Sequence, residues 1–150
     1  MAKLEQEIAA LFGLSLEEFT PARDRLAQRL KKEGRGDAAE EVRRLAKPSV
    51  PAWAINQLAR REQPAVRALL DAGSALRRAQ EQALSGTGPA DGLRDAQATE
   101  RKVVRGLTER ARTILEDAGR PAAASMLDRI ARTLAAAAVA EAGREALKAG

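Results

Sequence analysis

The sequence predicts an all-α protein, and three observations support this prediction. Apolar residues make up 45% of the 150-residue chain, yet its aromatic residues are limited to one Trp and two Phe. Much of the apolar content is Ala, which favours closely packed helices over sheets, because sheets prefer β-branched and aromatic residues. Apolar residues also recur at helical spacing between Gly and Pro breakers. We therefore expect an antiparallel bundle of three longer carboxyl-terminal helices with several shorter amino-terminal helices packed on it.

The amino-terminal helices are delimited by breaker and capping residues. Gly13 is expected to end a first helix. Ser15 and Glu18 follow with the spacing of a capping box, in which each side chain bonds the backbone N–H of the other residue. Thr20 and Pro21 are then expected to open a further helix, because Pro is favoured in the first helical turn.

Three more signals mark the following segments. The glycines at 34 and 36 are expected to end the preceding helix, and Asp37 to cap a short helix that reaches about residue 46. The stretch "KPSVP" separates this helix from the next one, which Ser49 is expected to cap. Pro64 is expected to start another helix near its first turn.

The second half of the chain predicts three longer helices, at about 65–84, 92–118 and 121–148. Between the first two, "SGTGPADG" has the composition of a flexible loop. In the last helix, Glu141 and Glu145 enter the apolar stripe, so we expect its final turns to leave the core or to meet a partner.

Length and hydropathy bound the organisation and location of the chain. A chain of 150 residues suits one domain, and we expect a single domain over 1–150 with subregions 1–63 and 64–150. The amino terminus is too short and too charged for a secretory signal, and no apolar run reaches the roughly 20 residues of a membrane span. We expect a cytoplasmic protein without a membrane partner.

Composition also restricts the chemistry. The chain has no Cys, His or Tyr. Thiol chemistry, imidazole catalysis and nearly all zinc and transition-metal sites are therefore excluded. The carboxylates are dispersed and form no calcium, phosphate-loop or dinucleotide motif. We expect no catalytic residues, no metal, no cofactor and no small-molecule ligand, and a protein that is not an enzyme; an enzyme that uses carboxylates, or a metal bound by them, is the least favoured alternative.

The helices at 65–84 and 92–118 have matching polar positions. In an antiparallel hairpin, facing residues have numbers with a constant sum, and a sum of 177 pairs Arg77 with Glu100 and Gln80 with Gln97. All four lie within apolar stripes, which predicts a buried or half-buried pair of Arg77 with Glu100 beside a contact of Gln80 with Gln97. The structural interpretation is that these pairs specify the helix register; a functional polar pocket is the alternative.

The helix after "KPSVP" carries the only Trp, on a face apart from the residues expected in the core. Trp53 falls with Asn56, Gln57 and Arg60, on the opposite side from Ile55. One interpretation is a central helix that is covered on both sides, with its amides and indole bonded to backbone groups. The others are a partner-binding face for a protein or, less favoured because it has one aromatic, a stacking site for an unpaired base.

The charge distribution suggests a second kind of contact. The net charge is +5, with 26 basic and 21 acidic residues, and no basic tail or block occurs. Arg25, Arg29 and Lys32 share one side of a predicted helix and, with Arg60 and Arg61, are candidate phosphate contacts. A plain solvated face is the alternative interpretation.

Residues 11–61 resemble the amino-terminal part of a family of helical bacterial proteins from high-GC genomes. The resemblance depends on the stretches "LFGLSLEEFTPARD" and "KPSVPAWAINQLAR". It implies a soluble helical protein, and it carries no known activity or site residue to this chain. The sequence thus leads us to expect a non-enzymatic interaction or adapter protein that docks a protein partner or a second copy of itself; a nucleic-acid-associated protein is the alternative.

Overall fold

The computed structural model describes residues 2–149, and their regular structure is entirely α-helical, which confirms the predicted fold class. By their internal contacts the residues divide into two compact units, Met1–Trp53 and Ala54–Gly150. The boundary falls inside a helix, α4 (Val50–Arg61), whereas the sequence suggests subregions that meet at Pro64. The two units are described separately below.

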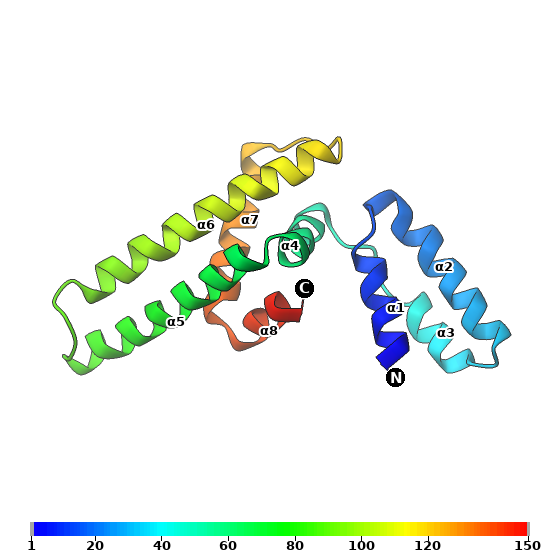
Figure 1. The fold of residues 1–150 in the computed structure, drawn as a ribbon, viewed down its shortest axis with the longest axis horizontal. Helices are drawn as coiled ribbons and strands as arrows, with labels where there is room; N and C mark the ends of the chain where they lie inside the picture. The colour runs from blue at the N-terminus through cyan, green and yellow to red at the C-terminus, as the bar shows by residue number, and fades with distance from the viewer. Residues whose placement is uncertain (1, 150) are drawn as a thin grey trace. The chain divides into compact units, whose positions relative to one another are not determined.

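The first unit contains three helices, α1 (Ala2–Phe12), α2 (Leu16–Lys32) and α3 (Gly36–Arg43), which are drawn from blue to cyan in Figure 1. Helices α2 and α3 pack side by side, and α1 packs on α2. The Phe12 and Phe19 rings lie 5.1 Å apart. The shared core is made by seven buried apolar residues: Leu11, Phe19, Leu26, Ala27, Leu30, Ala39 and Val42.

Local capping explains where these helices begin. The predicted capping box is confirmed, because the Glu18 N–H donates to Ser15 Oγ at 3.3 Å and the Ser15 N–H donates to Glu18 Oε1 at 3.4 Å. The predicted helix start at Pro21 is wrong, since Pro21 lies inside α2. Pro21 has no backbone N–H to donate, but the buried side chains of Phe19 and Leu26 on either side of it keep α2 continuous. Asp37 is not the cap of α3, which begins one residue earlier without a side-chain cap.

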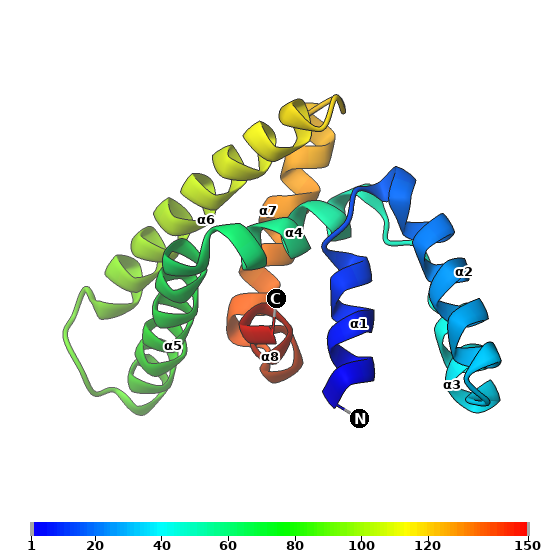
Figure 2. The same cartoon turned by 45° about the vertical axis from the view of Figure 1, so that its right-hand side comes forward.

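The second unit is built on a long helical hairpin, α5 (Gln63–Ser85) and α6 (Gly92–Asp117), which match the predicted ranges closely. The two helices run antiparallel, and both views show their loop end projecting away from the other helices of this unit (Figures 1 and 2). Gly86 ends α5 in the left-handed conformation, with φ at 70°, which Gly adopts without strain.

Helix α7 (Ala124–Val139) packs against both arms of the hairpin at the end away from the loop. Its approach to α5 is very close. A Cβ added at Gly73 would lie 2.1 Å from the Ala138 carbonyl oxygen. The core of this region is formed by Val66, Leu69, Leu70, Leu76, Val104, Leu107, Ala111, Ile114, Leu115, Leu127, Ile130, Leu134 and Ala138.

The predicted single helix at 121–148 is wrong, because the chain becomes extended at Ala140, with φ −90° and ψ 135°. A separate helix, α8 (Glu141–Ala149), turns back and packs against α7 and α5, with Leu147 buried. The break deprives the last carbonyls of α7 of their intrahelical donors. Arg144 supplies a replacement, since its guanidinium donates to the carbonyl oxygens of Ala138 at 2.7 Å and Leu70 at 2.8 Å.

In residues 2–149 we find no helix with both the length and the apolar character needed to cross a bilayer.

Candidate functional site

The predicted partner-binding face on α4 is not an open surface. Trp53 is 4% exposed, and its indole Nε1 donates to the Leu14 carbonyl oxygen at 2.8 Å. Gln57 is 2% exposed and makes a polar contact, while Asn56 and Arg60 are half-buried. The turn between α1 and α2 leaves a carbonyl that needs a donor, and the indole provides it. The structure therefore corrects the recognition-face interpretation and favours a buried helix.

The predicted phosphate-contacting cations lie in both units. Arg25, Arg29 and Lys32 are exposed on α2, and Arg61 is exposed at the end of α4. Arg29 is already engaged, since it forms ion pairs with Glu7 and, at 3.0 Å, with Glu33. Desolvation lowers the pKa of Arg29, but the hydrogen bonds and charges of these two carboxylates outweigh it and raise the pKa above its ordinary value. Phosphate binding by these cations stays a prediction.

The predicted buried pair of Arg77 with Glu100 and of Gln80 with Gln97 is also corrected. Arg77, Gln80 and Gln97 are exposed, and Glu100 is half-buried. Within residues 2–149, no ion pair joins Arg77 to Glu100, whose Oε1 has no hydrogen-bond partner. Gln80, Gln97 and Leu84 lie towards the loop of the hairpin, where two helices alone cannot enclose their facing stripes, and Leu84 is 90% exposed. Glu100, by contrast, lies beside α7.

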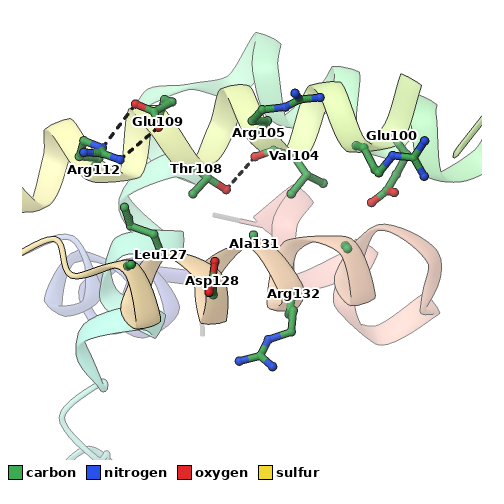
Figure 3. A pocket seen from close by; sticks show the side chains of 13 residues that line it. Glu100, Val104, Arg105, Thr108, Glu109, Arg112, Leu127, Asp128, Ala131 and Arg132 are labelled. Atoms are coloured by element: carbon green, nitrogen blue, oxygen red, sulfur yellow. Dashed lines mark hydrogen bonds and ion pairs between the residues drawn. The ribbon is translucent and has the colours of Figure 1, made fainter. Parts of the chain in front are cut away.

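An open groove of about 720 Å³ lies between α6 and α7 in the second unit (Figure 3). Its apolar floor comes from Val104 on α6 and from Leu127, Ala131 and Ala135 on α7. Thr108 also lines the groove, but its hydroxyl donates to the Val104 carbonyl oxygen at 2.8 Å and so offers no free donor. The floor of the groove is therefore made of small and apolar side chains.

Charged side chains border this floor. Arg101 and Arg105 come from α6 and Arg132 comes from α7, and no ion pair engages them in the part of the chain that the structure describes. Arg112, by contrast, pairs with Glu109 at 3.4 Å. The groove thus combines an apolar floor with guanidinium groups that are available to a ligand.

Two carboxylates complete the lining. Asp128 is exposed on α7, whereas the Oε1 atom of Glu100 on α6 is buried and accepts no hydrogen bond in the described residues. A buried carboxylate oxygen without a donor is energetically unfavourable, so it marks a place where a ligand donor would be stabilising.

The lining of the groove consists of apolar, cationic and acidic side chains. The groove contains no pairing of a nucleophile with a base, and in residues 2–149 no three acidic side chains lie close enough together to hold a metal ion. Sequence reasoning does not find the groove, because Arg105, Glu109 and Arg112 lie opposite the apolar stripe of α6, which is the pattern of an ordinary solvated face. The signal that could have found it is the recurrence of Ala124, Ala131 and Ala135 along one face of α7.

No protein-family model, no curated protein and no solved structure matches this chain. The resemblance of residues 11–61 to a bacterial family therefore stays a prediction, and a functional proposal has to rest on the geometry of the groove.

Proposed function

We propose that this protein is a non-enzymatic binding protein of the cytoplasm that docks an α-helix of a protein partner in the groove between α6 and α7. The observation that supports this best is the open groove of about 720 Å³ with an apolar floor. Apolar grooves between helices are a recurrent means of binding an amphipathic helix, whose side chains at i, i+3, i+4 and i+7 insert into the groove.

The dimensions and side chains of the groove fit a helix. The lining of α6 extends from Glu100 to Arg112, which corresponds to roughly 18 Å at about 1.5 Å per residue, or about three turns of a bound helix. Ala131 and Ala135 are half-buried, so their methyl groups are partly free to contact a ligand. Because these side chains are small, the backbone of a partner helix can approach closely.

The test is a selection of helical peptides of about 14 residues, roughly four turns, that carry a fixed apolar stripe and randomised polar positions. The full chain is the bait, and selected peptides are then measured by fluorescence anisotropy. Ala131→Trp fills the groove floor, so we expect it to weaken binding by about tenfold or more, equivalent to about 1.4 kcal/mol.

The matched control is Ala136→Trp, the same substitution at an exposed position of α7 that does not line the groove. We expect it to bind the selected peptides as the wild type does, and circular dichroism verifies that both variants are folded. The proposal is refuted if the selection recovers no binder, or if the recovered peptides bind Ala131→Trp as tightly as the wild type.

A further inference from the structure

We infer, on the basis of the proposed function, that the partner helix carries acidic side chains on both flanks of its apolar stripe and a hydrogen-bond donor where it meets Glu100. The inference concerns the chemistry of the occupant, and it follows from the lining charges that form no ion pair within residues 2–149.

The acidic flanks follow from the positions of Arg105 and Arg132. Figure 3 shows Arg105 on α6 and Arg132 on α7, on either side of the floor at Val104 and Ala131. No ion pair engages either guanidinium in the described residues. A helix lying on this floor would bring its two flanks next to the two cations, so carboxylates on both flanks give charge complementarity and fix the register.

The donor follows from Glu100. Its carboxylate points from α6 towards α7 in Figure 3, and its Oε1 is buried without a hydrogen bond. A partner side chain such as Lys, Arg or an amide at this end would donate to this carboxylate once the Glu100 side chain rotates and turns the oxygen towards the groove, which would relieve the unfavourable burial. The partner helix is therefore mainly acidic along its flanks, with one donor at an end of its stripe.

The same features favour a protein over a nucleic acid. A phosphate backbone would pair with Arg101, Arg105 and Arg132, but it offers no donor to Glu100 and would bring negative charge close to that carboxylate. It would leave the apolar floor without a complementary group. An acidic amphipathic helix uses the floor, the arginines and the carboxylate together.

The experiment compares two labelled peptides that share one selected apolar stripe and carry either Glu or Lys on both flanks. Each is titrated by anisotropy against the full chain, against the double variant Arg105→Glu/Arg132→Glu, and against Arg94→Glu/Arg129→Glu. The last is a matched control, because Arg94 and Arg129 are exposed on the same two helices outside the groove lining. It changes the net charge by the same amount.

We expect the wild type and the control to prefer the Glu peptide by about tenfold, as two rim ion pairs would give, and the groove variant to prefer the Lys peptide. A second arm tests the donor. An uncharged residue at each end of the Glu peptide is replaced with Lys in turn. The replacement at the end that meets Glu100 should tighten binding about fivefold in the wild type and should have no effect in Glu100→Gln.

The failures are distinguishable. If the Glu and Lys peptides bind the wild type equally and neither binds Ala131→Trp, the charge inference is wrong while the proposed function stands. If neither peptide binds the wild type, the charge inference and the proposed function are both wrong. Absence of any gain from the terminal Lys refutes the donor. A labelled DNA duplex of about 20 base pairs is the final arm. Three results together would overturn the inference in favour of a phosphate ligand. The duplex would bind more tightly than the Glu peptide, its binding would weaken steeply between about 50 and 200 mM salt, and the groove variant would not bind it.

Discussion

Substitution of Gly73 tests the close contact between α5 and α7. In Gly73→Ala the new Cβ would lie 2.1 Å from the carbonyl oxygen and 2.8 Å from the carbonyl carbon of Ala138. Ordinary contact begins at 3.4 Å, so the two helices must separate locally by about 3.4 − 2.1 = 1.3 Å. Because the opposing atoms belong to the backbone, no side-chain rotation can relieve the overlap.

The expected cost is the difference between two opposing effects. Overpacking of this kind costs about 1–3 kcal/mol, and we place it at the upper end because the obstruction is backbone. Replacing Gly by Ala within a helix favours folding by up to about 1 kcal/mol. The net loss is therefore about 2 kcal/mol, or a Tm lower by roughly 10 °C for a unit of this size.

The control is Gly106→Ala, the same substitution in α6, where an added Cβ meets nothing within 4 Å. Here only the helix-propensity effect remains, so stability should rise by about 0.5–1 kcal/mol. Urea unfolding followed by circular dichroism measures both variants. The structural reasoning is refuted if Gly73→Ala is as stable as the wild type, or if the two substitutions shift stability in the same direction.

Two further substitutions test partly buried hydrogen bonds by the same unfolding assay. Arg144→Met removes the guanidinium that donates to the Ala138 carbonyl oxygen, so we expect the free energy of unfolding to fall by about 1–3 kcal/mol. Lys148→Met, at an exposed position of the same helix, should change it by no more than about 0.5 kcal/mol. Equal effects of the two substitutions would contradict the anchoring role of Arg144. Trp53→Phe keeps an aromatic ring but removes the indole N–H, so we expect the free energy of unfolding to fall by about 1–3 kcal/mol. Leu84→Ala, at an exposed position, should leave stability nearly unchanged. An unchanged stability of Trp53→Phe would contradict the contribution of the indole hydrogen bond.

Helix positions were predictable where local chemistry determines them. Ser15 and Ser49 both cap helices as expected, since a side-chain oxygen that accepts from an N–H of the first turn is a short-range signal. The break at Ala140 has no such signal, because the surrounding sequence is rich in Ala and contains no Pro or Gly between residues 124 and 142. The entry of Glu141 and Glu145 into the apolar stripe predicted only that the final turns leave the core or meet a partner, and it did not predict a break.

The site was less predictable, because burial depends on how many elements surround a residue. Angular position alone placed Arg77 and Gln80 within a stripe that faces the other arm of the hairpin, but both are exposed because α7 packs only at the opposite end. Conversely, Arg105 has the pattern of a solvated position and becomes a groove residue because α7 runs beside it. Hydrophobic periodicity predicts which residues share a face of a helix, but it does not predict which other element covers that face.

The placement of the only Trp gives the chain a natural optical reporter of one of its halves. Trp53 belongs to the first compact unit and is bonded to Leu14 of that unit, and the chain has no Tyr. Indole emission during denaturation therefore tracks the melting of this half, while ellipticity tracks the helices of both. A single unlabelled sample gives two melting curves, and the offset between them is a direct readout of how cooperatively the two halves unfold.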